Sequence, residues 1–304
     1  MNERWAYWNG EFVPASRVAV AVTDGGFVQG TTVAEQLRTF RGQLFRLEAH
    51  VDRLLHSLSI VEVDGGLSRS QWLDTARELA ARNHSLLRPG DDLGLVMFVT
   101  PGDYGPMTEH APTRPTVCLH TFPLRFNLWG PLYQSGQPLS TTDVVQVSAR
   151  CWPRELKCRS RMHYYLADRQ ARRRDPASRA LLVDEDGFVT ETTTANVVGF
   201  RRDVGLVTPP HEKILPGISL KVLLELAAKL GVSHVERDMT PADLALCDEV
   251  FLTATSSCIL AVSRVNGKSI GDGTPGPMFA RFLSAWSELV GVDIAGQAVE
   301  FAAR

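Results

Sequence analysis

The sequence of 304 residues lacks the long apolar runs and the charge excess that mark several classes of protein. No stretch approaches the ~20 apolar residues that a membrane-spanning helix needs, and the N-terminal residues show no basic segment followed by an apolar one. We therefore expect a cytoplasmic protein without a membrane partner. The formal net charge of −2 argues against a nucleic-acid partner as well.

Cysteine pairs and nucleotide-binding loops are also missing. The five cysteines are odd in number, form no C-x-x-C pair and have no histidines at zinc-site spacing, so we expect neither structural disulfides nor a bound metal. The absence of a GxGxxG or Walker-type loop removes support for a nucleotide-binding fold. The composition is that of a globular chain, 44% hydrophobic and 22% charged, and its length suits two domains.

The first part of the chain shows turn signals and helical spacing in alternation. Asn9-Gly10 and Arg41-Gly42 mark the tips of two hairpins, and apolar residues recur at helical intervals after Arg46. The predicted elements are strands at 7–8, 11–13, 32–40, 43–46, 93–100 and 116–124, and helices at 47–61 and 68–84. Together they predict an N-terminal α+β domain at residues 1–124.

Residues 125–141 contain Gly and Pro without a clear period and are predicted to be an interdomain linker. The second domain, residues 142–304, mixes strands and helices. The predicted strands are 144–148, 179–183, 195–200, 205–208, 249–254 and 259–265, and the predicted helices are about 161–174, 218–230, 241–246 and 277–290. This pattern favours a barrel-like or layered domain over a regular doubly wound sheet.

Periodicity does not locate an active site, but several separated segments form a consistent set. Lys157 stands where a strand and turn give way to a helix, and Glu191 precedes a run of small Thr and Ala residues. The segments concerned are 156–167, 187–197, 214–219 and 251–257, joined by His50-Val51-Asp52-Arg53-Leu54 in the first half.

In their order and spacing these segments resemble the fold-type IV pyridoxal-phosphate (PLP) enzymes. That family includes branched-chain and D-amino-acid aminotransferases and aminodeoxychorismate lyase, and the resemblance runs from about Tyr7 to Leu289. It implies a mixed α/β, two-domain protein similar to D-amino-acid aminotransferase, with a small N-terminal α+β domain and a larger, barrel-like, PLP-binding C-terminal domain. It also implies a homodimer.

The resemblance assigns a role to each segment. Lys157 resembles the lysine that forms the Schiff base with PLP, which needs an amine kept partly neutral by burial or nearby cations. Glu191 resembles the carboxylate that bonds the pyridine nitrogen and keeps it protonated. The predicted phosphate ligands are unpaired amides at a helix start, hydroxyl groups after a strand and one arginine: Gly217, Ile218, Ser219, Thr255, Ser256 and Arg53. Taken singly, each has an ordinary structural explanation as a cap, a turn or a solvated side chain.

The implied reaction is transfer of an amino group from an amino acid or amine to a 2-keto acid by a ping-pong mechanism, with Lys157 as anchor and base. A PLP lyase of the aminodeoxychorismate lyase type is the alternative, and a non-catalytic PLP-fold binding protein is a remote one. The arginines by which relatives bind the substrate carboxylate are replaced by Gly94 and Pro101. The candidate substrate-binding positions are Gln29, Ala34, Arg38, Arg125, Arg159 and Arg161.

Overall fold

The computed structural model describes residues 3–109 and 114–303, so Met1 and Asn2, considered above for a leader segment, lie outside it. The chain divides into two compact units. Unit 1 consists of Met1–Leu124 and Leu156–Ser160, and unit 2 consists of Arg125–Glu155 and Arg161–Arg304. Lys157 therefore belongs to the unit built mainly from the first part of the chain.

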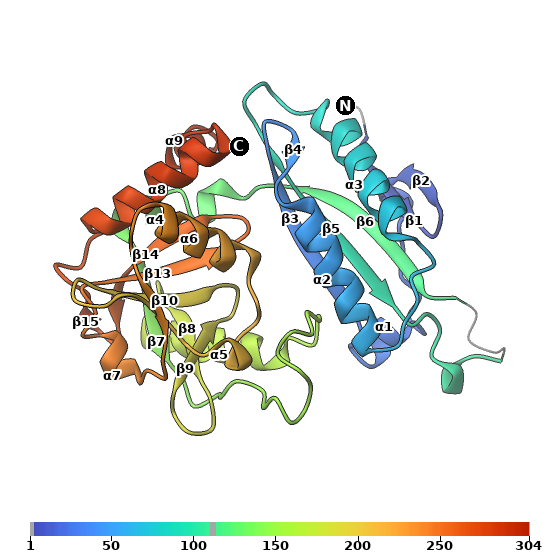
Figure 1. Ribbon diagram of the computed structural model, residues 1–304. Helices are drawn as coiled ribbons and strands as arrows, with labels where there is room; N and C mark the ends of the chain where they lie inside the picture. The colour runs from blue at the N-terminus through green and yellow to red at the C-terminus, as the bar shows by residue number, and fades with distance from the viewer. Residues whose placement is uncertain (1–2, 110–113, 304) are drawn as a thin grey trace. The chain divides into compact units, whose positions relative to one another are not determined.

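Unit 1 is an antiparallel sheet covered on one face by helices α2 and α3 (Figure 1). The sheet has the order β2-β1-β6-β5-β3-β4. Its strands are β1 (Trp5–Trp8), β2 (Glu11–Pro14), β3 (Val33–Phe40), β4 (Gln43–Leu44), β5 (Leu93–Thr100) and β6 (Thr116–Pro123), and its helices are α1 (Gly25–Val28), α2 (Leu47–Ile60) and α3 (Arg69–His84). Both predicted hairpins and both predicted longer helices are confirmed.

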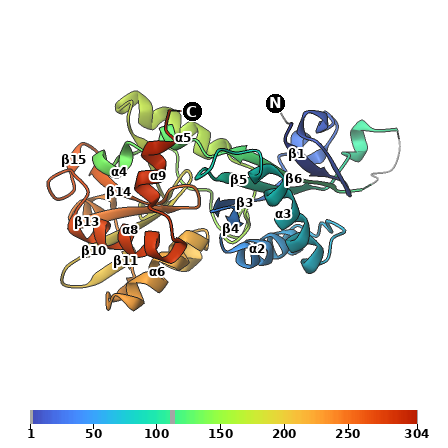
Figure 2. The ribbon, with the colours of Figure 1, turned by 90° about the horizontal axis from the view of Figure 1, so that it is seen from above.

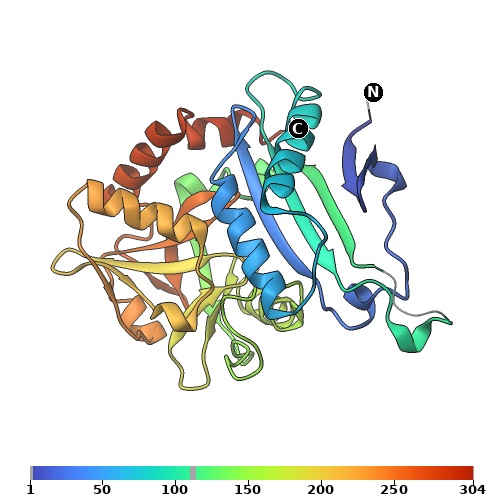
Figure 3. The same ribbon diagram turned by 45° about the vertical axis from the view of Figure 1, so that its right-hand side comes forward.

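Apolar residues at helical spacing hold α2 on the sheet. Val51, Leu54 and Leu58 are buried and share one core cluster with Leu37 of β3 and Leu95 of β5, because side chains three and four positions apart lie on one helix face. Figure 3 shows α2 lying along β3. This packing fixes the side chains that α2 directs toward β3.

The segment Leu156–Ser160 extends the sheet of unit 1 beside the N-terminal half of β3. The Ala34 amide donates to the Lys157 carbonyl at 3.0 Å, and the Arg159 amide donates to the Thr32 carbonyl at 2.8 Å. The Lys157 amide donates to Ser57 Oγ of α2 at 3.1 Å. The backbone of Lys157 is therefore held from both sides within unit 1.

Unit 2 is built on a sheet that closes on itself. The strand order is β12-β11-β10-β13-β14-β7-β8-β9, and β9 also pairs with β10 through Glu191 and Asn196, which completes a ring of strands. The strands are β7 (Gln137–Thr141), β8 (Arg179–Val183), β9 (Val189–Thr192), β10 (Asn196–Arg201), β11 (Gly205–Thr208), β12 (His234–Glu236), β13 (Glu249–Ala254), β14 (Cys258–Val265) and β15 (Lys268–Ser269). The expected barrel-like architecture is confirmed.

Helices surround this barrel. α6 packs on β13, α8 packs on β13 and β14, and α5 packs on β7 and β8, as Figure 2 shows for α6 and α8. The helices of unit 2 are α4 (Leu132–Ser135), α5 (Met162–Arg174), α6 (Ile218–Lys229), α7 (Pro241–Leu244), α8 (Pro277–Val290) and α9 (Ile294–Glu300). None of the helices in the described part of the chain is long and apolar enough to cross a membrane.

Two sequence-based assignments differ from the structure of unit 2. The strand predicted at 144–148 is irregular backbone, whereas β7 lies inside the stretch 125–141 for which a linker is predicted. β7 is an inner strand, and its Pro138, which has no amide hydrogen to donate, lies where the pairing with β14 is interrupted by a bulge. Because proline is usual in loops, Pro138 led to the prediction of a linker where the structure has a strand.

Candidate active site

Glu191 is the central polar group of unit 2. It lies within β9, a strand that is not among those predicted from the sequence, and its side chain is buried. Tyr164 Oη and Gln146 Nε2 each donate to Glu191 Oε1 at 2.6 Å. Burial raises the pKa of Glu191, while hydrogen bonds from Tyr164, the Leu215 amide and Gln146, and then the charge of Arg154, oppose that rise. Among the described residues, the donors to this carboxylate are all neutral.

Asn196 connects Glu191 to the start of α6. It pairs with Glu191 across β9 and β10 and with Thr253 across β10 and β13. Its Nδ2 donates to the Leu215 carbonyl at 2.9 Å. A Cβ atom on Gly217 would lie only 1.9 Å from Asn196 Oδ1, so the close approach of α6 to the strand requires glycine at that position.

The start of α6 has the features of an anion site. Gly217 is the N-cap and supplies no side-chain cap, and the first intrahelical bond runs from the Lys221 amide to the Gly217 carbonyl. The amides of Ile218 and Ser219 therefore have no partner within the helix, and the helix dipole favours a negative charge beside them.

Further hydroxyl donors lie at the end of β13. Thr253 Oγ1 is buried and has no hydrogen-bond partner among the described residues. Thr255 and Ser256 follow in the turn before β14, and Thr253 faces Asn196 in the strand register. Asn196 thus joins Glu191, the start of α6 and the end of β13, and the predicted hydroxyl groups of Thr255 and Ser256 follow that strand end.

Unit 1 contains Lys157 and Arg53, together with a second buried carboxylate. Arg53 donates from Nε to Glu35 Oε1 at 2.6 Å and from Nη2 to Oε2 at 2.9 Å. His50 Nδ1 lies 2.7 Å from Glu35 Oε2, and since an ionised carboxylate only accepts, Nδ1 is the donor. Burial alone would raise the pKa of Glu35, but the charge of Arg53 and the bonds from His50 and Arg53 hold it well below its usual range.

His50 links this ion pair to Lys157. Burial lowers the pKa of His50, and the positive charges of Arg53 and Lys157 lower it further, although Glu35 opposes the shift. A neutral His50 next to two cations avoids adding a third positive charge to a buried cluster. The structure thus groups Lys157, Arg53, His50 and Glu35 in one electrostatic environment.

The candidate substrate residues occupy both units. In unit 1, Gln29 ends α1, Ala34 is buried beside the Lys157 carbonyl and Arg159 is exposed. Arg38 is buried on β3, where Nε donates to the Thr39 carbonyl and the guanidinium lies 4.1 Å from the Phe40 ring centroid.

In unit 2, Arg125 is exposed before a short 3-10 turn. The guanidinium of Arg161 lies 4.6 Å from the Tyr164 ring centroid and donates to the Thr193 carbonyl. The Arg161 side chain is therefore part of the support around Glu191.

The sequence analysis assigned no role to four of these polar groups: Tyr164, Glu35, Gln146 and Asn196. Tyr164 follows the lysine in a helix where aromatic residues are more often core, and nothing near His50 or Arg53 in the sequence indicates that Glu35 is their partner. Gln146 lies in a stretch that reads as a strand, and Asn196 has no role until β9 and β10 are paired. Apart from the pairing of Glu191 with Asn196 in the neighbouring strands β9 and β10, each contact joins residues far apart in the chain. No local sequence pattern therefore predicts these contacts.

Comparisons with known proteins agree with this arrangement. The family described as amino-transferase class IV matches residues 32–265, most of the chain. The chain is a class IV aminotransferase. It is 30% identical to a D-alanine aminotransferase from Bacillus licheniformis over 272 residues, which cover 89% of this chain and 92% of that protein.

Solved structures extend the likeness to the whole fold. The branched-chain amino acid aminotransferase of Escherichia coli superimposes with a TM-score of 0.87 at 25% identity, covering 95% of each chain. The branched-chain amino acid aminotransferase of Thermobaculum terrenum, solved in its PLP form, has the same fold, with a TM-score of 0.82, 20% identity and coverage of 99% of this chain and 97% of that one.

The residues of the enzyme fit a phosphorylated pyridine. A protonated ring nitrogen needs an anionic acceptor, and Glu191 is a buried carboxylate surrounded by neutral donors. A phosphate ester needs amide and hydroxyl donors, which the start of α6 and the end of β13 supply. The close contact at Gly217 keeps bulk away from that helix start.

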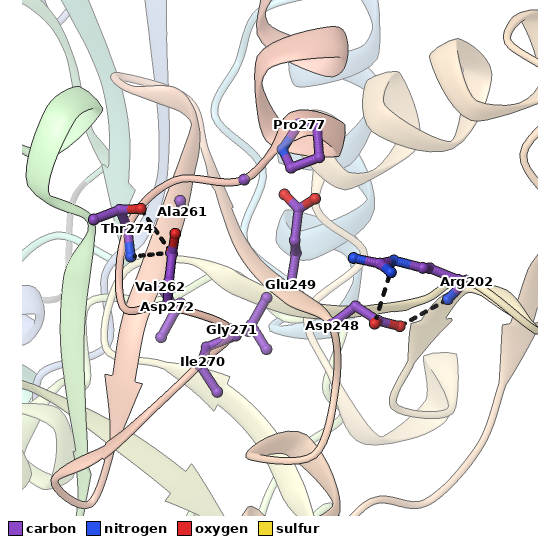
Figure 4. Close-up of a pocket in the computed structure, with 12 residues that line it drawn as sticks. Arg202, Asp248, Glu249, Ala261, Val262, Ile270, Gly271, Asp272, Thr274 and Pro277 are labelled. Atoms are coloured by element: carbon purple, nitrogen blue, oxygen red, sulfur yellow. Dashed lines mark hydrogen bonds and ion pairs between the residues drawn. The ribbon is translucent and has the colours of Figure 1, made fainter.

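A separate hollow of about 210 Å³ lies between β13, β14 and the start of α8 (Figure 4). Its acidic groups have structural partners: Glu249 accepts from the amides of Met278 and Phe279 at 2.8 Å each, and Asp248 pairs with Arg202. Asp272 accepts from Thr274. This hollow therefore holds caps and an ion pair, and we assign it no part in the chemistry.

Proposed function

We propose that this class IV aminotransferase uses PLP, attached through the amine of Lys157, to transfer an amino group between an amino donor and a 2-keto acid. In this proposal Glu191 pairs with the pyridine nitrogen. The proposed phosphate ligands are the group predicted from the sequence: Gly217, Ile218, Ser219, Thr255, Ser256 and Arg53. Family membership supports the cofactor, and the relatives named above are aminotransferases, so they lend no support to the lyase alternative.

The observation that carries this proposal is the environment of Glu191. A buried carboxylate is costly unless it is paired or hydrogen-bonded, and here the bonds come from Tyr164, Gln146 and the Leu215 amide. Such a carboxylate can accept a hydrogen bond from a protonated ring nitrogen. PLP, when bound, supplies an electron-accepting ring that stabilises negative charge at the substrate Cα.

The chain's own residues have the remaining tasks. Lys157 Nζ, once released, takes the proton from the substrate Cα, a role that needs a neutral amine. Glu35 pairs with Arg53 and with His50, and the charge of Lys157 acts on His50, so these side chains form the polar surroundings of the lysine within unit 1. The backbone bonds of Lys157 to Ala34 and Ser57 keep the base in position.

The test of this proposal is the variant Lys157→Ala. We expect the purified wild type to be yellow, with a visible band that amino donors bleach, and Lys157→Ala to lose both the band and turnover. Lys229→Ala, a substitution of an exposed lysine at the end of α6, is the matched control and should keep both. Retained turnover in Lys157→Ala would refute the assignment of the lysine.

The amino donor is open, because the similar proteins include both D-alanine and branched-chain aminotransferases. A screen of L- and D-amino acids and (R)-amines, each with a 2-keto acid acceptor, would identify it. Aminodeoxychorismate belongs in the same screen, since release of pyruvate without an acceptor would indicate lyase chemistry. We also propose a homodimer, by resemblance to the family, which light scattering of the purified enzyme would test.

A further inference from the structure

Tyr164 lies in the first turn of α5, the helix that follows the lysine. Met162, which begins this helix, is 69% exposed. Two residues later, Tyr164 directs its hydroxyl onto the buried carboxylate of Glu191 at 2.6 Å. Burial, and then the charge of Glu191, raises the pKa of Tyr164 far above its ordinary value, so this hydroxyl stays a donor.

Gln146 holds the same carboxylate oxygen from another segment. It is 2% exposed, and its Nε2 donates to Glu191 Oε1 at 2.6 Å and to Tyr164 Oη at 3.2 Å. Its own Oε1 accepts from the Val147 amide at 3.0 Å, and its backbone amide donates to the Val183 carbonyl. Because the carboxamide oxygen is occupied, the amide nitrogen is the end that faces Glu191.

The ring of Tyr164 has contacts with two neighbouring side chains. The guanidinium of Arg161 lies over it and is itself bonded to the Thr193 carbonyl. The ring of His163 lies 3.9 Å from the Tyr164 ring, centroid to centroid. Close contacts of this kind restrict side-chain rotation, so the hydroxyl is held toward Glu191 before any ligand binds.

These contacts leave part of the carboxylate available. A carboxylate offers about four acceptor positions, and Tyr164, Gln146 and the Leu215 amide are the donors to Glu191 in unit 2. With two of the three bonds directed to Oε1, the carboxylate has one orientation and retains capacity for a further donor. The Glu191 carboxylate would therefore not have to rotate in order to bind a cationic nitrogen.

We infer that Tyr164 and Gln146 are positioning residues for the transamination reaction, which act through Glu191 by fixing its carboxylate to receive a protonated ring nitrogen. This inference rests on the proposed function, because it takes Glu191 as the partner of the cofactor's pyridine nitrogen. It names two residues of this chain that set the strength of that contact without touching the reacting atoms.

The experiment compares two probes on the cofactor-free full-length chain. One is PLP, and the other is 1-deaza-PLP, in which a C–H group replaces the ring nitrogen and leaves Glu191 nothing to bind. The dissociation constant of each probe is measured for the wild type, Tyr164→Phe, Gln146→Leu and a control, Tyr165→Phe. Tyr165 is the next residue along the chain and is 58% exposed.

We expect the wild type and Tyr165→Phe to prefer PLP over the deaza analogue by the same factor. In Tyr164→Phe and Gln146→Leu that preference should fall roughly tenfold, since a hydrogen bond that helps to fix a charged group is lost. Affinity for the deaza analogue should change little, because the phosphate ligands are untouched.

Each other result has a definite meaning. An unchanged preference in both variants, or an equal loss of affinity for both probes, would overturn the inference, the latter by showing a merely structural role. Equal affinity of the wild type for both probes would instead refute the assignment of Glu191 and leave Tyr164 without this function. Far-ultraviolet circular dichroism confirms folding, and if Tyr164→Phe fails to fold, Gln146→Leu decides the question.

Discussion

Each unit of this enzyme buries one glutamate in a polar network, and the two networks differ in charge. In unit 1, Glu35 is bound by the guanidinium of Arg53 and by His50, and its pKa is held low. In unit 2, Glu191 is bound by Tyr164 and Gln146, and burial leaves its pKa raised. Glu35 is paired with a cation at hydrogen-bond distance, whereas the hydrogen-bond donors to Glu191 are neutral and Arg154 acts on it only through its charge.

The difference separates a structural role from a functional one. A buried anion that already has its counter-ion needs no further cation, and removing one partner of such a pair destabilises the fold. A buried anion supported only by neutral donors has a perturbed pKa that favours an additional cation, and this condition is typical of functional sites. Four substitution experiments test this difference between the two networks.

The largest effect on stability is expected for Glu35→Gln. Removing one partner of a buried ion pair leaves the charge of Arg53 uncompensated, and this costs about 3–5 kcal/mol of unfolding free energy. Urea denaturation followed by circular dichroism measures the loss. Glu48→Gln, which removes an exposed partner of Arg77, should cost no more than about 1 kcal/mol. A similar small loss for both variants would contradict the structural role of Glu35.

Glu191→Gln should show the opposite profile. Glutamine can still accept from Tyr164, and no ion pair is broken, so the unfolding free energy should change by about 1 kcal/mol or less. Turnover depends on the negative charge, and kcat/KM should fall by roughly ten- to a hundred-fold, the equivalent of losing one hydrogen bond between charged groups. If kcat/KM stays at the wild-type value, the proposed pairing with the ring nitrogen is wrong.

Two glycine-to-alanine substitutions, one in each unit, separate an effect on stability from an effect on cofactor binding. A Cβ atom on Gly217 would lie 1.9 Å from Asn196 Oδ1, and one on Gly94 would lie 2.1 Å from the Phe122 ring. Each alanine variant should lose about 1–3 kcal/mol of stability through overpacking. Only Gly217→Ala should also weaken PLP binding, measured by titration of the cofactor-free protein. Weakened binding in Gly94→Ala alone would reverse the assignment of the anion site.

The smallest effect concerns acid stability. Burial, and then the charges of Arg161 and Arg154, lowers the pKa of His163 to about 4. Protonation is therefore easier in the unfolded chain, so stability is complete above about pH 6.5 and falls as the pH drops toward 4. His163→Phe, which keeps a ring against Tyr164, should reduce the loss between pH 7 and pH 4.5 by about 1–2 kcal/mol. Identical pH profiles would exclude His163 as a source of acid sensitivity.

Much of the fold was predictable from local patterns. Asn9-Gly10 and Arg41-Gly42 specify their hairpins, and the apolar spacing of α2 and α6 specifies those helices. Local patterns fail where a strand is defined by its neighbours. β7 contains Pro138 and is stabilised by pairing with β8 and β14, and β12 has only three residues beside β11.

The candidate site was predictable only in part. Motif resemblance indicates Lys157, Glu191 and the start of α6, because these positions share local context with relatives. The partners of the two glutamates were not indicated: Gln146 lies 45 residues from Glu191, and Arg53 lies 18 residues from Glu35. Such pairs depend on which strands and helices come together in space, and that information is not contained in any short window.

The short segment Leu156–Ser160 also limits where this chain can be divided or recombined with a relative. A polypeptide cut at Leu124 would leave the Ala34 amide and the Thr32 carbonyl without the partners they have in unit 1. The portion beyond the cut would carry Lys157 on a segment detached from the sheet that it extends. A chimera that exchanges either part with a relative must therefore preserve the backbone bonds between this segment and β3.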